Sequence, residues 1–294
     1  MTTPDTLPET PPKTLIVAGA TGYGVWPANS LEGTRHCLAA PIDGIEIDVQ
    51  MTADGHVVAH HDYWLNPNAS RLDGRWLEAR GPALKSVTLA DLAPYDVGSL
   101  LPGSEYAQRY GARQPMDGVR IPTLRALFEA LKAADGPRRL FYIEIKTDPT
   151  DPDAAPDPVL VTNAVIEEVE AADYIAHSKI IAFDWQVLRL AKARNPDIAT
   201  AHLTIRHAPS SETSPWRDGC DSHLHGDSDL AAIKAHGGME WSPYFTDVTP
   251  ERVVEAATLD LRVGPWGLSS QEDIDRMIAL GVFSATVSGP YWAR

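Results

Sequence analysis

Cysteines, basic side chains and long apolar runs are all scarce in this chain of 294 residues. Its two cysteines, Cys37 and Cys220, lie far apart and form no metal-binding pair. So few cysteines favour reduced thiols, although the sequence alone leaves a single disulfide open. Residues 1–12 have neither the basic start nor the apolar segment of a secretory signal, and their composition predicts a flexible lead-in. We therefore expect a cytoplasmic protein.

The charge balance narrows the choice of partner. The chain has 25 lysines and arginines against 40 aspartates and glutamates, a net charge of −15. No basic stripe is present for a nucleic acid, and an anionic membrane surface is disfavoured for the same reason. No apolar run reaches the roughly 18 residues that a membrane-spanning helix needs. These absences favour a small-molecule partner, and an anionic one requires a local cation in the site. The sequence does not indicate an oligomeric state.

Short apolar segments alternate with segments of helical periodicity along the chain. Strands are expected at residues 15–18, 44–50, 140–145, 179–183, 199–203, 239–243, 261–265 and 283–287. Helices are expected at residues 29–39, 123–134, 158–172, 185–193, 229–236, 250–257 and 271–280. Eight such units predict an α/β fold, a (β/α)8 TIM barrel, with residues 13–294 as one domain. An open doubly wound sheet is the alternative, because residues 18–24 superficially resemble a glycine-rich phosphate loop.

One further extended segment, residues 56–60, follows the dipeptide Asp54-Gly55, which is typical of a two-residue β-turn. So short a connection forces an antiparallel neighbour, and we expect a hairpin with the second strand. Counting outward from the turn places Asp48 opposite His61.

Residues 64–120 interrupt the alternation and contain several glycines and prolines. Active sites of such barrels are built from loops at the C-terminal ends of the strands. We therefore expect a small insertion after the hairpin, at about residues 64–120, that covers this mouth and influences substrate choice.

Two carboxylates mark the second strand. Glu46 and Asp48 are two residues apart, so their side chains share one face, and both faces of a barrel strand are buried. Buried carboxylates repel each other and lose hydration, so a cation or hydrogen-bond donors must compensate. The hairpin brings His61 beside them as a candidate catalytic residue. The alternatives are two surface charges on a half-exposed strand and a purely structural histidine.

A third carboxylate, Glu144, shares a face of the strand at residues 140–145 with Lys146, which follows it. Together with Glu46 and Asp48 it makes an all-oxygen set that favours a hard divalent ion such as magnesium or calcium. Lys146 can contact an anion such as phosphate. The alternative is a Glu144–Lys146 ion pair along the strand.

These motifs, taken together, resemble the glycerophosphodiester phosphodiesterase family over residues 15–290. The segments that carry the resemblance are IEID at 45–48, TADG at 52–55, HHD at 60–62, IPTLRALFEAL at 121–131 and YIEIK at 142–146. The resemblance implies a (β/α)8 barrel with an insertion after the second strand region. It also implies metal-binding carboxylates at Glu46, Asp48 and Glu144, one of two catalytic histidines at His61, and a lysine near the phosphate at Lys146.

The chain departs from the family pattern at its first motif. The family opens with His-Arg-Gly and then Pro-Glu-Asn-Thr, and Pro27 and Asn29 keep the second of these in register. This register puts Gly19 at the first catalytic histidine and Ala20 at the phosphate-binding arginine. Further replacements are Ala28 for glutamate, Ala182 for serine, Ser269 for asparagine, and Val287 and Ser288 for threonine and aspartate.

The resemblance implies attack of a substrate hydroxyl on phosphorus, with one histidine as base and the other as acid. We therefore expect a metal-dependent phosphodiesterase for a glycerophosphodiester or a related phosphodiester, with an altered mechanism or substrate. The alternative is a non-catalytic barrel that binds a phosphorylated ligand, since one lost histidine costs about 10²–10⁴ in rate. A replacement can come from His223 or His225, which have metal-like spacing on a polar loop, or from His36 in the first helix.

Overall fold

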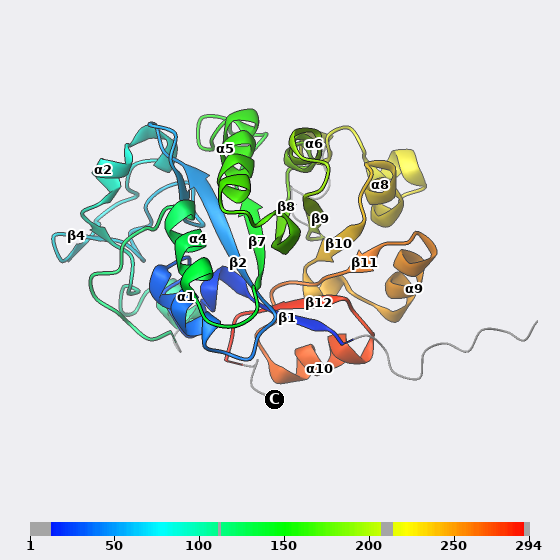
Figure 1. The fold of residues 1–294 in the computed structure, drawn as a ribbon, viewed down its shortest axis with the longest axis horizontal. Helices are drawn as coiled ribbons and strands as arrows, with labels where there is room; N and C mark the ends of the chain where they lie inside the picture. Colours follow the sequence, from blue (N-terminus) through cyan, green and yellow to red (C-terminus); the bar gives the residue numbers. More distant parts are fainter. Residues whose placement is uncertain (1–12, 111–112, 207–213, 291–294) are drawn as a thin grey trace, which may run out of the picture.

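The computed structural model describes residues 13–110, 113–206 and 214–290 (Figure 1). Eight strands pair in parallel in the order β11-β10-β9-β8-β7-β2-β1-β12. The two end strands are also joined, because Phe283 N donates a hydrogen bond of 2.8 Å to the carbonyl of Val263. The strands are β1 (Leu15–Ala18), β2 (Gly44–Met51), β7 (Leu140–Ile145), β8 (Ser178–Ala182), β9 (Ala199–Thr204), β10 (Glu240–Pro243), β11 (Arg262–Val263) and β12 (Ser284–Val287). The nearly closed barrel confirms the predicted (β/α)8 fold.

Helices surround this sheet (Figure 1). They are α1 (Leu31–Leu38), α4 (Leu124–Ala133), α5 (Pro158–Ala171), α6 (Trp185–Arg194), α8 (Asp229–Ala235), α9 (Pro250–Thr258) and α10 (Gln271–Ala279). In α4, four buried apolar residues recur at helical spacing, Leu124, Leu127, Phe128 and Leu131. No helix in the described ranges is long and apolar enough to cross a membrane. Cys37 and Cys220 are free thiols.

The two faces of β2 have different partners. Ile45, Ile47 and Val49 point outward and join the large apolar core that includes helix residues such as Leu127. The alternate positions Glu46 and Asp48 therefore point into the barrel, as the spacing predicts. A separate small cluster of Val17, Tyr142, Ile181, Ala201 and Leu203 fills the barrel interior. The strand thus carries a continuous apolar face outside and a charged face inside.

The hairpin is confirmed, but its register differs from the expected one. β3 (Val57–Ala59) pairs antiparallel with β2, and Val49 lies opposite Ala59. The connection is one residue longer than a two-residue turn, because Thr52 N donates to the carbonyl of His56 at 2.9 Å. Its last residue, Gly55, has the left-handed φ of +83° that such loops favour. The pairing therefore shifts by one position, and Asp48 lies opposite His60 rather than His61.

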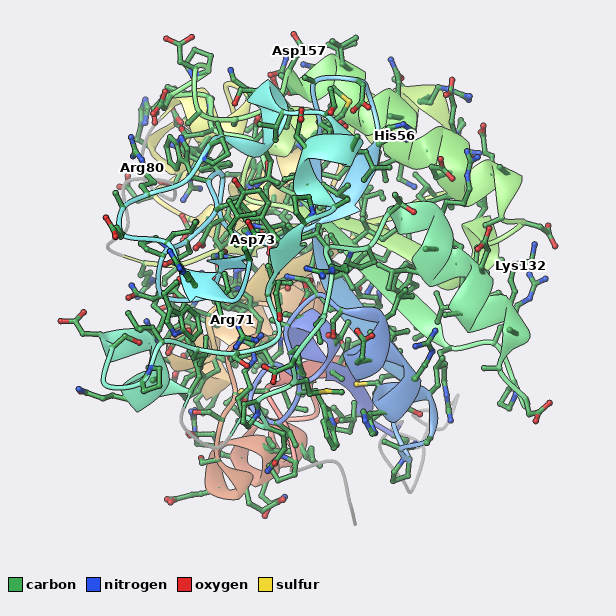
Figure 2. The ribbon with its side chains drawn as sticks, turned by 90° about the vertical axis from the view of Figure 1, so that its left-hand side faces the viewer. His56, Arg71, Asp73, Arg80, Lys132 and Asp157 are labelled. Carbon is green, nitrogen blue, oxygen red and sulfur yellow. The ribbon has the colours of Figure 1, made fainter. Side chains whose placement is uncertain are left out.

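The insertion forms a small structure of its own on one side of the molecule (Figure 2). It contains α2 (Leu89–Leu92), α3 (Glu105–Arg109), a 3₁₀ turn (Leu84–Ser86) and a sheet of β5 (Arg75–Trp76), β4 (Arg71–Leu72) and β6 (Tyr95–Asp96). Arg71 forms ion pairs with Asp96 and Asp117, in which its Nη2 lies 2.8 Å from Asp96 Oδ2 and 2.6 Å from Asp117 Oδ1. A separate apolar cluster holds it together: Val58, Leu65, Leu84, Leu92, Val97, Val119 and Ile121.

Shorter 3₁₀ turns complete the connections. They are Gly19–Thr21, Ile175–His177, Ser214–Arg217, Ser222–His225 and Phe245–Asp247. The strands predicted from sequence periodicity match the barrel strands in position, whereas these turns carry no periodic signal. The expected lead-in at residues 1–12 lies outside the described residues.

A buried histidine on β9 makes stability sensitive to acid. His202 is 2% exposed, and its Nε2 lies 2.9 Å from Nδ1 of His236, whose Nε2 lies 3.2 Å from Asp218. Burial and the neighbouring His236 lower the pKa of His202 to about 3. Because the unfolded chain takes up this proton near pH 6.5 and the folded chain does not, stability falls as pH falls from 6.5 toward 3.

We expect this group to remove about 2 kcal/mol of stability between pH 7.5 and pH 5. Denaturant unfolding at both pH values measures the change, and His202→Gln provides the comparison. The variant should be less stable than the wild type at pH 7.5, but it should lose less stability on acidification. An equal loss in the two proteins would contradict the assignment.

Candidate active site at the mouth of the barrel

A cavity of about 750 Å³ opens at the C-terminal ends of the strands. The barrel supplies its floor, through Glu46, Asp48, Glu144, Ile181, Leu203, Ser242 and Thr286. The insertion supplies part of its wall, through Asn66, Ala69, Val97, Tyr106, Arg109, Tyr110 and Arg113. The insertion therefore borders the mouth at which barrel enzymes bind their substrates.

The three predicted carboxylates meet on this floor. Glu46 and Asp48 come from β2, and the parallel register of β2 and β7 places Glu144 beside Asp48. All three are buried, and each offers an oxygen within 4.8 Å of the others. Three buried carboxylates so close together require positive charge in the same place.

Lys146 supplies part of that charge. Its Nζ lies 2.9 Å from Asp48 Oδ1 and 2.5 Å from Glu144 Oε1. The ion pair that the sequence left as an alternative is thus present, but the lysine bridges two strands rather than lying along one. Burial lowers the pKa of Lys146, and Asp48 and Glu144 raise it by more, so the lysine stays charged. One lysine leaves two of three ionised carboxylates uncompensated.

Two residues after β1 position the carboxylates. The backbone N–H of Ala20 donates to Glu46 Oε2 at 2.7 Å, with Ala20 held at a φ of +41° that is rare for a residue with a side chain. Asn29 donates to Asp48 Oδ2 at 2.8 Å and accepts from the backbone N–H of Asp48 at 3.0 Å. The loop therefore aims both side chains into the cavity, at the cost of local backbone strain.

The pKa values of the three carboxylates are shifted in different directions. Burial, Asp48 and Glu144 raise the pKa of Glu46 well above its ordinary value. Burial also raises the pKa of Glu144, against the effect of Lys146. Burial acts to raise the pKa of Asp48 too, but Lys146, His61 and Asn29 bring it down to about 2. Glu46 therefore has no cation paired with it, and Glu144 shares Lys146 with Asp48, so the triad retains negative charge that a divalent ion would compensate.

His61 lies on the wall beside this floor. Its Nδ1 is 2.8 Å from Asp62 Oδ1, and its side chain is 64% exposed. Lys146 lowers the pKa of His61, but Asp48 and Asp62 raise it by more. His60 also lines the cavity, with Nδ1 2.9 Å from the carbonyl of Asp62. His61 thus reaches the site even though the strand register differs from the expected one.

The other histidine candidates lie elsewhere. His36 stacks on Trp26, with ring centroids 3.6 Å apart. His223 and His225 lie in the 3₁₀ turn Ser222–His225, and neither is among the residues that line the cavity. Part of the polar loop that precedes this turn lies outside the described residues. None of these three histidines lines the cavity, so His60 and His61 are the histidines that the described residues place there.

Sequence reasoning missed the aromatic and cationic wall. Tyr23 from the β1–α1 loop meets Tyr110 edge-to-face at 5.4 Å, and Tyr106 meets Tyr110 at 5.7 Å. Arg109 and Arg113 also line the cavity and form no ion pair with a described carboxylate. A clustering of tyrosines and arginines at residues 106–113 was the available signal, but without periodicity it predicts no direction for any side chain.

Comparison with known proteins identifies the family. The Glycerophosphoryl diester phosphodiesterase family matches residues 19–287. The chain belongs to this family. A curated glycerophosphodiester phosphodiesterase from Caldanaerobacter subterraneus is 26% identical over 282 residues, covering 95% of both chains. Another, from Bacillus subtilis, is 24% identical and covers 95% of this chain and 85% of that protein.

Solved structures of phosphodiesterases also resemble this chain in fold. A glycerophosphoryl diester phosphodiesterase structure from Silicibacter pomeroyi is 30% identical with a TM-score of 0.85, over 96% of this chain and 92% of that one. A phosphodiesterase from Oleispira antarctica, solved with the product sn-glycerol-3-phosphate, is 17% identical with a TM-score of 0.67, over 94% of each chain. Members of the glycerophosphoryl diester phosphodiesterase family hydrolyse phosphodiester bonds, and the family is metal-dependent. The buried acidic triad gives this member a candidate metal site.

Proposed function

We propose that this protein hydrolyses a glycerophosphodiester, with a divalent ion held by Glu46, Asp48 and Glu144. The observation that carries the proposal is the buried triad of carboxylates, with oxygens within 4.8 Å of one another, in one cavity with His61. A binding protein for a phosphorylated ligand has no need of three buried carboxylates, since they repel the ligand. The Oleispira structure with bound sn-glycerol-3-phosphate supports a substrate with a glycerol phosphate part.

The donor set fits a hard ion. Glu46, Asp48 and Glu144 offer oxygen alone, which suits magnesium or calcium. Oxygens remain for it, because Glu46 Oε1 and Glu144 Oε2 accept no hydrogen bond from the described residues. Such an ion, when bound, neutralises charge on the phosphate oxygens.

The groups around the triad have separate tasks. The hydrogen bond from Nδ1 of His61 to Asp62 leaves Nε2 to accept the proton of the attacking substrate hydroxyl. Lys146 holds the floor together and presents positive charge to a phosphate. Arg109 and Arg113 provide further cations on the part of the cavity wall that the insertion supplies. They could contact the phosphate in place of the family arginine, whose position is occupied here by Ala20. Burial lowers the pKa of Arg113 to about 10, which still leaves it charged at neutral pH.

Metal-stripped protein is expected to hydrolyse glycerophosphocholine only after magnesium or calcium is restored, because the triad alone repels the phosphate. Release of choline, measured with each ion and with chelator, tests this. His61→Gln should keep ion binding and lose about 10²–10⁴ of the rate. Turnover that survives chelation would contradict the metal assignment. Binding of sn-glycerol-3-phosphate without turnover under any ion would favour the non-catalytic alternative.

A further inference from the structure

The space beside Gly19 is already filled. Gly19 follows β1 at the cavity wall, where the family places its first catalytic histidine. A β-carbon added at Gly19 would lie 3.2 Å from Thr286 Cγ2 and 3.4 Å from Cε1 of the Tyr23 ring. The ring of Tyr23 therefore lies in van der Waals contact with the position of a β-carbon at residue 19.

The β1–α1 loop holds Tyr23 in this place. The backbone N–H of Tyr23 donates to the carbonyl of Gly19 at 3.1 Å, and the preceding Gly22 has the left-handed φ of +78°. The ring packs edge-to-face on Tyr110 of the insertion, with centroids 5.4 Å apart. Ser288 lies close enough to the phenol of Tyr23 to lower its pKa, against the effect of burial. The backbone and the ring of Tyr23 are both held in place, so the phenol is pre-positioned on the cavity wall.

Tyr23 lines the same cavity as the carboxylate triad and the proposed base His61. Glu46 and His61 line the same cavity, and Glu46 is close enough to Tyr23 to act on it electrostatically. Another hydroxyl of the wall is already engaged, because Tyr106 donates to Asp62 at 3.4 Å. Tyr23 thus brings a phenol hydroxyl to the same wall as position 19, and its ring contacts that position.

We propose that Tyr23 donates the proton to the departing alcohol, in place of the histidine that is absent at position 19. This rests on the proposed function. As a hydroxyl of the substrate attacks phosphorus and forms the new O–P bond of a cyclic phosphodiester, its proton passes to His61. The bond from phosphorus to the departing oxygen breaks, and that oxygen takes the proton of Tyr23. When water opens the cyclic phosphodiester, it returns a proton to the Tyr23 oxygen, and His61 protonates the ring oxygen that leaves.

The direction of transfer follows from acidity. Burial, Tyr110 and Glu46 raise the pKa of Tyr23 to about 12. The phenol is therefore protonated at neutral pH and acts as a donor, which leaves the task of base to His61. An alkoxide is a stronger base than this phenolate, so the proton moves toward the departing oxygen.

Dependence on the leaving group tests the proposal. A choline alkoxide needs a proton, whereas 4-nitrophenolate leaves without one. Tyr23→Phe keeps the ring that packs on Gly19 and Tyr110 and removes only the hydroxyl. We expect it to lower kcat on glycerophosphocholine by about 10²–10⁴ and to change hydrolysis of the glycerol 4-nitrophenyl phosphodiester by less than about tenfold. Tyr142→Phe is the matched control, because the Tyr142 hydroxyl is buried without a partner and does not line the cavity.

The outcomes distinguish failure of the role proposed for Tyr23 from failure of the proposed phosphodiesterase function. An equal loss on both substrates, in a variant that binds the metal normally, would show a structural role for Tyr23 and overturn its role as donor. Unchanged turnover of both substrates would overturn it as well. A wild-type protein that hydrolyses neither substrate with any divalent ion would overturn the proposed function, and the role of Tyr23 with it.

Discussion

Replacing Glu46 by glutamine is expected to lower phosphodiester hydrolysis by about 10³-fold or more and, in the metal-free protein, to raise the free energy of unfolding. Hydrolysis falls because the substitution removes one of the three carboxylates that we propose as metal ligands. The gain follows because burial, Asp48 and Glu144 raise the pKa of Glu46, so its ionised form opposes folding at pH 7. Glutamine carries no charge at this position, so we expect the metal-free variant to be more stable than the metal-free wild type at pH 7.

Titration calorimetry with magnesium and calcium, together with denaturant unfolding in chelator, measures both effects. Glu240→Gln is the matched control, because Glu240 is also a buried glutamate of the barrel but accepts from Lys179 Nζ at 2.6 and 2.7 Å. Its removal leaves a buried lysine uncompensated and should cost about 3–5 kcal/mol with ion binding retained. A Glu46→Gln protein that binds the ion as the wild type does would refute the metal site. A metal-free Glu46→Gln protein that is less stable than the metal-free wild type would refute the claim that ionised Glu46 opposes folding.

Restoring the family residues alone, in Gly19→His/Ala20→Arg, is expected to give no gain on glycerophosphocholine. The β-carbon of residue 19 would lie 3.2 Å from Thr286 and 3.4 Å from the Tyr23 ring, so the imidazole displaces Tyr23 or is itself turned away. Adding Tyr23→Ser to the pair makes room for the imidazole. We then expect the triple variant to exceed Tyr23→Ser alone by about 10²–10⁴ in kcat/KM, the effect of one acid–base group.

Steady-state kinetics of the wild type and the three variants test this, with circular dichroism and ion titration to confirm folding and metal loading. A large gain in the double variant would show that the space at position 19 is open. A triple variant no faster than Tyr23→Ser would show that the site differs from a family site by more than its first histidine and arginine.

The parts of the fold that were predictable are those in which sequence pattern and burial coincide. The barrel strands are short apolar runs between helical segments, and the alternation of Glu46 and Asp48 with isoleucines gave the inward direction of the carboxylates. The hairpin register was missed because Asp54-Gly55 suits a two-residue turn and the end of a longer loop equally well. One residue of loop length decides which partner faces Asp48.

The cavity wall could not be predicted in the same way. Tyr110 and Arg113 lie in an insertion without regular periodicity, and their approach to the β1–α1 loop depends on a tertiary contact, in which Gln114 N donates to the carbonyl of Val25 at 2.7 Å. The bridging of Asp48 and Glu144 by Lys146 depends likewise on the register between two strands far apart in sequence. No local propensity encodes either contact.

The separate apolar cluster of the insertion has an evolutionary consequence. Its buried side chains come from the insertion and the segments that flank it, whereas the carboxylates stand on strands stabilised by the large core of the barrel. Selection for a different alcohol group can therefore remodel the insertion, or exchange it whole, without disturbing the three carboxylates on the floor of the cavity. In this arrangement the chemistry is inherited with the barrel, and the choice of substrate can diversify at its rim.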